Sequence, residues 1–335
     1  MLNTQQRRLS AFIFILLGLS GCDTPNNNIN IALGPDASTT QQLSQQVLNS
    51  YGVNNDDYNA HFLPFDKALK GLQDGSIDIS MSFLGLPTNG IKSLQAATGD
   101  VTLLSLPEEV IADIEQHSDY QRFTIPTSSY QFLTKEVSTL TAYAVLMANT
   151  QTINDQMGYQ LARIMYNATL APLPHAQSHF LSLKYALDGG SHLPIHPGAK
   201  RFYEEQGLTV TLPVAQLSAA GAKQEFIFGT GSQGGTYYPL GGELTTRWNE
   251  QLPSVNFTNV ATQASIENLH SLREGKMDLG MTVNVSAVNA LQGKGAFAEQ
   301  AVENIAFIGQ LYPEVFQVVT RKRGDLSSFA DIKRQ

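Results

Sequence analysis

The chain has 335 residues, which allows two domains of ordinary size, each around a large buried core. Its formal net charge of −8 argues against nucleic acid or an anionic membrane surface as the main partner. The single cysteine, Cys22, excludes an intrachain disulfide, a zinc ribbon and an iron–sulfur cluster. No apolar run reaches the ~18–20 residues of a membrane-spanning helix, so the composition favours a two-domain globular protein.

The first 22 residues are typical of a bacterial export signal. Arg7 and Arg8 form a positive region before a nine-residue apolar core at 11–19. The sequence Leu19-Ser20-Gly21-Cys22 then resembles a lipobox, in which the cysteine is lipidated after cleavage. A plain secretory signal, a buried N-terminal helix and twin-arginine export are the alternatives. We expect a signal peptide at 1–21, a lipidated Cys22 and a polar tether at 22–28.

Strands and helices alternate after the tether. Apolar residues alternate from 29 to 33 and predict a strand, which Gly34 ends. Ser38 can cap a helix that runs to about 51, a second helix covers about 66–74, and a second strand covers 77–81. Strand, helix and strand at this spacing imply right-handed crossovers and a mainly parallel sheet.

The same pattern recurs 200 residues later in the chain. Residues 68–79 match residues 268–279, and both segments contain a Gly-x-x-Asp turn between a helix and a strand. Each copy follows a strand, a small-residue turn and a helix, so the sequence predicts two similar α/β lobes. A chance likeness between ordinary α/β sequences is the alternative. Between the copies we expect a strand at 139–147, helices at 151–169 and 172–187, and a linker at 209–224.

Two motifs suggest chemistry that their surroundings do not support. Residues 229–234 fit G-x-G-x-x-G, but the next expected strand, at about 254–260, ends without the acidic residue of a dinucleotide site. The histidine pairs 175/179 and 192/196 have metal-ligand spacing. Prolines at 194 and 197 break the second pair, and the first follows prolines at 172 and 174 without an acidic partner nearby. We therefore expect no metal, no cofactor and no enzyme activity.

Hydroxyl-bearing turns follow several expected strands. They lie at 38–40, 236–238 and 262–265. Ligands of open α/β sheets bind beyond the carboxyl ends of the strands, so these turns predict a cleft between the lobes for a small polar ligand. Helix capping alone is the alternative explanation for these residues.

A family resemblance joins these features. Residues 229–242 resemble the opening of the TAXI-type solute receptors of TRAP transporters, which are type II periplasmic binding proteins. Thr262 with Ser265, the turn at 274–278, and residues 310–314 and 329–333 follow the N-terminal half of that family in order. Residues 30–208 resemble its C-terminal half, most specifically at 193–203.

The two halves stand in the reverse of the family's order, which indicates a circular permutation. A frameshifted or recombined gene is the alternative. The resemblance implies an α/β, two-lobed Venus-flytrap fold with hinge strands between the lobes. It divides the chain into lobe A (29–138 plus 319–335), lobe B (149–314), hinge strands (139–148 and 315–318) and a linker joining the ancestral termini (209–224).

The resemblance also implies a function. It implies an extracytoplasmic lipoprotein that captures a small organic anion, such as glutamate, 2-oxoglutarate or a related carboxylate, and delivers it to a TRAP membrane permease. Asp23 resembles an inner-membrane retention signal, so we expect a periplasmic receptor anchored to that membrane. A ligand-sensing lipoprotein that signals to a membrane partner without transport is the alternative.

Ten residues are predicted to bind the ligand. Two of them depart from the resembled family, because Asn284 stands where that family often has glutamine and Ser286 where it often has aspartate. Glycines of the family are also replaced here at positions 37, 39, 263 and 264. The predicted ligand-binding residues are Ser38, Thr40, Gly231, Thr236, Tyr237, Tyr238, Thr262, Ser265, Asn284 and Ser286.

Overall fold

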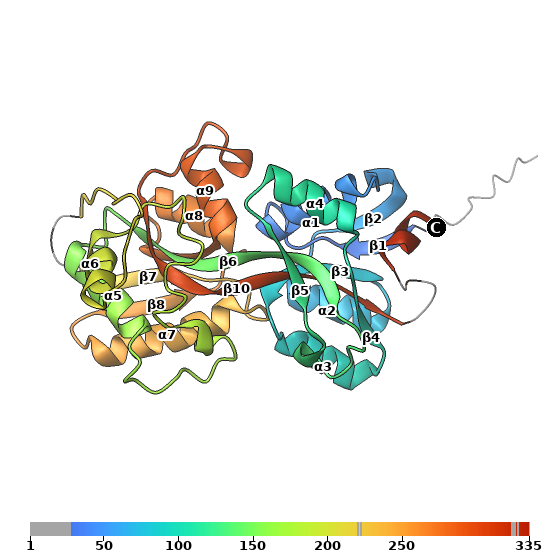
Figure 1. Cartoon of the computed structure of the whole chain (residues 1–335), viewed down its shortest axis with the longest axis horizontal. Helices are drawn as coiled ribbons and strands as arrows, with labels where there is room; N and C mark the ends of the chain where they lie inside the picture. The colour runs from blue at the N-terminus through green and yellow to red at the C-terminus, as the bar shows by residue number, and fades with distance from the viewer. Residues whose placement is uncertain (1–27, 220, 222, 323–325, 327, 335) are drawn as a thin grey trace, which may run out of the picture.

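The computed structural model describes residues 28–334 except 220, 222, 323–325 and 327. The predicted signal peptide, Cys22 and most of the predicted tether lie outside the described residues. Two α/β lobes lie side by side and are joined by two long strands (Figure 1). The two similar lobes predicted from the repeat are therefore present. None of the helices in the described part of the chain has the length and apolarity that a bilayer crossing requires.

Lobe A is built from the first part of the chain. Strand β1 pairs in parallel with β2 and β3, helices α1 and α4 cover one face of the sheet, and α2 and α3 cover the other (Figure 1). Its elements are β1 (Ile29–Ala32), α1 (Thr39–Ser50), β2 (Tyr58–His61), α2 (Phe65–Asp74), β3 (Ile79–Gly85), α3 (Asn89–Thr98), β4 (Val101–Leu104), α4 (Glu108–His117) and β5 (Gln121–Ile125), with 3-10 turns at Asn55–Asp57 and Thr127–Ser129.

Lobe B repeats the same order of strands around β7. Strand β7 pairs in parallel with β8 and β9, and the fully buried Trp248 packs against Phe228 and Phe257 in its core. Its elements are α5 (Asp155–Met165), α6 (Pro197–Glu205), β7 (Glu225–Gly229), α7 (Tyr237–Gln251), β8 (Asn256–Val260), α8 (Ser265–Arg273), β9 (Leu279–Val283) and α9 (Asn284–Leu291), with 3-10 turns at Ser178–Phe180 and Gly295–Phe297.

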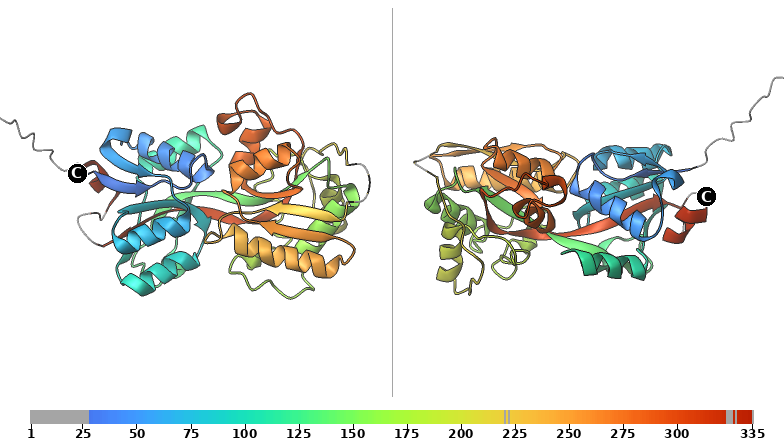
Figure 2. Two further views of the ribbon diagram at one scale, coloured as in Figure 1. Left: turned by 180° about the vertical axis from the view of Figure 1, so that it is seen from behind. Right: turned by 90° about the horizontal axis from the view of Figure 1, so that it is seen from above.

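Strands β6 (Val137–Asn149) and β10 (Ile305–Arg321) run antiparallel through both lobes (Figure 2). β6 pairs with β5 of lobe A at 137–141 and with β9 of lobe B at 144–148. β10 pairs with β3 from Glu314 onward. The chain therefore passes between the lobes at about 142–143 and 313–314, inside the first predicted hinge segment and just before the second. The sheet order is β2-β1-β3-β10-β6-β9-β7-β8.

The repeated Gly-x-x-Asp turn has the same role in each lobe. The Asp78 carboxylate accepts a hydrogen bond of 2.8 Å from the backbone N–H of Asn30, at the start of β1. The Asp278 carboxylate accepts one of 2.8 Å from the N–H of Ile227 in β7. Each aspartate thereby joins the strand that follows its turn to the first strand of its lobe. This shared contact explains why the spacing recurs in both lobes.

Three expectations about local structure need correction. The helix expected at 151–169 is shorter, since α5 spans Asp155–Met165. No helix covers 172–187, where only the 3-10 turn at Ser178–Phe180 is regular. The sheet is mixed, because β4, β5, β6 and β10 pair antiparallel with their neighbours.

The segment at 209–224 contains no helix or strand among its described residues. It packs along lobe B, where Ala215 donates its N–H to the Ile195 carbonyl and the Thr150 carbonyl accepts from Ser218 and Ala219. Its role in joining ancestral termini stays a prediction. β10 ends in lobe A, and the residues described after it also pack there, with the Phe329 ring edge-on against Tyr51.

Candidate functional site

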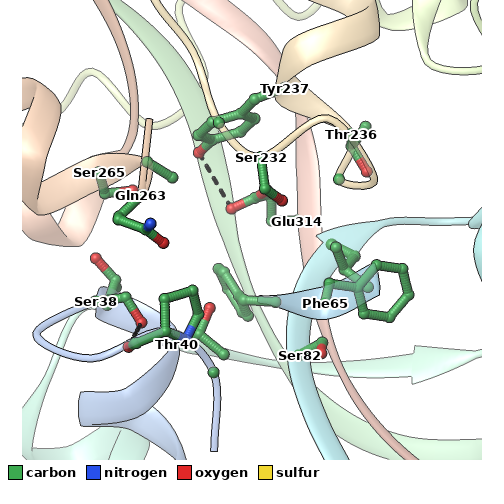
Figure 3. Close-up of a pocket in the computed structure, with 18 of the residues that line it drawn as sticks. Ser38, Thr40, Phe65, Ser82, Ser232, Thr236, Tyr237, Gln263, Ser265 and Glu314 are labelled. Carbon is green, nitrogen blue, oxygen red and sulfur yellow. Dashed lines mark hydrogen bonds between the residues drawn. The ribbon is translucent and has the colours of Figure 1, made fainter. Parts of the chain in front are cut away.

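A cavity of about 80 Å³ lies between the two lobes (Figure 3). A cavity needs roughly 10–15 Å³ to hold a single water, so this one has room for several waters or one small molecule. Residues from both lobes line it: Gly34, Pro35, Ser38, Thr39, Thr40, Phe65, Ser82, Phe83, Leu84, Gly231, Ser232, Gly235, Thr236, Tyr237, Thr262, Gln263, Ala264, Ser265, Val283 and Glu314.

Four helices begin at this cavity, two from each lobe. α1 and α2 of lobe A present their first residues, Thr39 and Phe65, and α7 and α8 of lobe B present Tyr237 and Ser265. The first four N–H groups of a helix lack intrahelical partners, and the helix dipole adds partial positive charge there. Among the described lining residues none is lysine, arginine or histidine. The groups in the cavity wall that suit an anion are therefore backbone N–H groups and hydroxyls.

Two turns at the cavity have an unusual backbone. Ala37, before α1, has φ +53°, and Ala264, before α8, has φ +68° and ψ −143°. These are two of the positions where the resembled family has glycine, the residue that adopts positive φ most easily. The Thr262 hydroxyl supports the second turn, because it accepts a hydrogen bond of 3.0 Å from the Ala264 N–H. Such strain is typical of backbone held close to a ligand.

Glu314 is the one acid among the described residues that line the cavity, and it is absent from the predicted ligand-binding residues. It lies on β10 where the chain passes between the lobes, and its side chain is only 5% exposed. The Tyr237 and Tyr312 hydroxyls donate hydrogen bonds of 3.2 Å to its two oxygens. Burial raises the pKa of Glu314 to about 8, against the smaller lowering effect of those hydrogen bonds.

A signal for Glu314 does exist in the sequence. The residue is an acid inside an otherwise apolar stretch, and it belongs to the matched segment 310–314. An acid in such a strand must be paired, exposed or functional. Only the tertiary structure places it in the cavity.

The lobes touch each other around the cavity. The hydroxyls of Thr39 in lobe A and Ser286 in lobe B share a buried hydrogen bond of 2.8 Å. The Thr236 hydroxyl accepts one of 3.3 Å from the Gly85 N–H. The Gln177 amide donates one of 3.2 Å to the Leu86 carbonyl. These contacts join the lobes on both sides of the cavity, so the structure describes a closed arrangement.

Seven of the ten predicted residues line the cavity: Ser38, Thr40, Gly231, Thr236, Tyr237, Thr262 and Ser265. The cavity does not include the other three. The Tyr238 carbonyl accepts from the Asn259 amide, and the Asn284 side chain accepts from the Tyr143 N–H in β6. Ser286 lies outside the cavity and makes the contact between lobes described above.

The four histidines at 175, 179, 192 and 196 contact protein groups other than a shared metal site. His196 caps α6 by accepting from the Gly198 N–H, and its second ring nitrogen bonds the Ile153 carbonyl. Burial lowers the pKa of His196, which favours the neutral ring that this arrangement requires. Within the described ranges, no three His, Cys, Asp or Glu side chains form a group suited to a metal ion.

Several solved structures resemble this chain at low identity. One is a binding-protein component of an ABC phosphonate transporter from Pseudomonas aeruginosa (11% identity, TM-score 0.44, covering 91% of this chain and 72% of that one). Another is a phosphate-binding protein of a phosphate ABC transporter from Streptococcus pneumoniae (12% identity, TM-score 0.40, covering 91% of this chain and 94% of that one). A third is PhnD1 from Prochlorococcus marinus in complex with methylphosphonate (10% identity, TM-score 0.42, covering 89% of this chain and 78% of that one).

A family model matches most of the sequence. The NMT1-like family matches residues 26–207 and 228–335. The match leaves out residues 208–227 and with them the whole segment at 209–224, whose described residues contain no helix or strand. Two α/β lobes joined by two crossing strands form the two-lobed, Venus-flytrap type of periplasmic-binding-protein fold, which confirms the predicted fold class. The chain belongs to the NMT1-like family.

Proposed function

We propose that this protein is an extracytoplasmic solute receptor that captures a small organic carboxylate between its lobes. The observation that carries the proposal is the cavity, which both lobes line with hydroxyls and with the N-termini of two helices each. Helix N-termini bind carboxylates through free N–H groups and the helix dipole. Glutamate, 2-oxoglutarate and related acids are the ligand class that the sequence resemblance suggests.

Capture works by closure of the lobes. A ligand that contacts both lobes binds the closed form more tightly than the open form, so it shifts the population toward closure. Two strands connect the lobes, which is the arrangement of hinge-closing binding proteins. The hydrogen bond between Thr39 and Ser286 joins the two lobes, so it stabilises the closed state and not the open one.

Ligand-induced closure and thermal stabilisation test this proposal. Ligand-free protein is screened against small carboxylates by thermal unfolding, and hits are followed by small-angle scattering. We expect a hit to raise the melting temperature and to reduce the radius of gyration. A panel without stabilising carboxylates, or binding without compaction, contradicts the proposal.

A matched pair of variants locates the binding. Thr40 lines the cavity, whereas Thr246 is exposed on α7. We expect Thr40→Val to weaken binding about tenfold through loss of a hydroxyl hydrogen bond to the bound anion, and Thr246→Val to leave it unchanged. Equal effects of the two substitutions would show that the ligand binds elsewhere.

Delivery to a TRAP permease and a lipid anchor complete the proposal. They rest on the resemblance of 229–242 to TAXI-type receptors and on the lipobox at Leu19-Ser20-Gly21-Cys22. Cys22→Ser is expected to release the protein from the membrane fraction into the periplasm, while the wild type stays membrane-bound. Loss of ligand uptake on deletion of a TRAP permease tests the transport partner.

The reversed order of the family's halves supports a circular permutation. β1 begins directly after the tether, and the chain ends beside the same lobe (Figure 1). Close ends make permutation physically tolerable. We expect a chain that joins residue 335 to residue 29, and starts at residue 225, to fold and to bind the same ligand. Failure of this chain to fold would argue against an ancestral order of that kind.

A further inference from the structure

Glu314 is the one ionisable carboxyl among the described residues that line the cavity. Figure 3 shows it in the middle of the site, facing Tyr237 and lying between the turns of the two lobes. A carboxyl at this point is unexpected in a site that binds anions, because a carboxylate repels one. Its role therefore bears on which ligands the cavity accepts.

The groups that face Glu314 are hydroxyls. Tyr237 from α7 and Tyr312 from β10 donate to its oxygens, and Tyr120, which precedes β5, is also within electrostatic reach. Among the described residues of the cavity wall no cationic side chain faces it. Ionised Glu314 is thus hydrogen-bonded but lacks a counter-charge. A buried charge in that condition is costly until a partner of opposite charge arrives.

A ligand can supply the positive charge that ionised Glu314 lacks. An ammonium group beside Glu314 would form an ion pair, while the carboxylate of the same ligand lies at the helix N-termini. The small volume of the cavity keeps the two ligand charges a few atoms apart, as in an amino acid. A 2-oxo acid of the same skeleton lacks the ammonium and leaves Glu314 unpaired.

We propose that Glu314 is the specificity-determining residue of the site and pairs with a protonated amino group, so that the receptor selects small amino acids over the matching 2-oxo and 2-hydroxy acids. This inference rests on the proposed carboxylate-receptor function. Pairing with an ammonium ion favours the ionised carboxyl, so Glu314 releases its proton on binding near neutral pH.

Calorimetry with matched ligands tests the inference. The probes are alanine with pyruvate, aspartate with oxaloacetate, and glutamate with 2-oxoglutarate. The two members of each pair differ only at the carbon next to the carboxylate, which carries an ammonium group in one and an oxo group in the other. We expect an amino acid to bind at least about 100-fold more tightly than its oxo acid. In Glu314→Gln, which keeps the side-chain volume and a hydrogen-bonding amide, amino-acid affinity should fall about 30-fold or more. Oxo-acid affinity should stay or rise.

The pH dependence of the wild type gives a second readout that needs no variant. Because burial raises the pKa of Glu314 to about 8, amino-acid affinity should rise with pH between 5.5 and 7.5, by at most tenfold per unit, and level off only above that pKa. Binding heats should vary with the ionisation enthalpy of the buffer, as one proton is released. Oxo-acid affinity should stay flat over the same range.

The possible failures are distinguishable. If an oxo acid binds as tightly as its amino acid, or Glu314→Gln keeps the preference, this inference is overturned and the carboxylate receptor stands. Amino-acid affinity that does not change between pH 5.5 and 7.5 overturns it as well. If none of the six probes binds or compacts the protein, both the inference and the proposed function are rejected.

Discussion

Replacement of Glu314 by glutamine should stabilise the ligand-free protein, and increasingly so as the pH rises. The folded-state pKa of about 8 lies above the ordinary value of 4.5 because the side chain is buried. Between these values the folded state holds a proton that the unfolded state has lost, so stability declines as pH rises. At 1.36 kcal/mol per unit, a single site with these two pKa values loses about 3 to 4 kcal/mol between pH 5 and 8.

Urea unfolding of ligand-free protein at pH 5, 6, 7 and 8 measures this effect. Subtracting the wild-type free energy of unfolding from that of Glu314→Gln cancels the titration of all other groups. The difference should grow in favour of the variant by about 3 to 4 kcal/mol from pH 5 to 8. Glu250→Gln, at an exposed position of α7, is the control and should show a difference that is nearly independent of pH. A flat difference for Glu314→Gln would refute the reasoning.

Three further substitutions test other parts of the structure. Gly198→Ala should destabilise the protein by about 3 kcal/mol or more in urea unfolding, because its Cβ would lie 2.0 Å from the Asp155 carbonyl oxygen, in backbone that cannot move aside. Ser286→Ala should lower ligand affinity about three- to tenfold in calorimetry, because the closed form loses its hydrogen bond to Thr39. Ala264→Gly should raise the free energy of unfolding by about 1 kcal/mol, since relief of ~1–3 kcal/mol of backbone strain exceeds the ~0.5–1 kcal/mol entropic cost of glycine. An unchanged or lower value for Ala264→Gly would show that the positive φ is not strained.

Local patterns allowed much of the fold to be predicted. The turns at 75–78 and 275–278 are visible in the sequence because their glycine, spacing and aspartate serve contacts that recur in each lobe. Residues of all three hydroxyl turns line the cavity, in keeping with parallel strands that end at the same edge of a sheet, and their role in binding stays a prediction. Such features depend on few residues that are close in the chain.

Other features depend on contacts that are distant in sequence or on the phase of a helix. Glu314 lies in the site because β10 brings it to Tyr237, 77 residues away in the chain. Tyr237 lines the cavity and Tyr238 does not, since neighbouring helical side chains point about 100° apart and the sequence does not fix the first helical residue to within one position.

The position of β10 has a consequence for how the protein matures. Lobe A contains the earliest residues of the fold, yet its sheet takes β10 as the neighbour of β3, and its core includes Phe316, Val318 and Phe329. During synthesis from the N-terminus, those residues are added last. Lobe B needs only 305–313 of β10 for its pairing with β6 and can assemble earlier. Lobe A therefore stays incomplete, with part of its apolar core exposed and prone to aggregation, until nearly the whole chain has been synthesised.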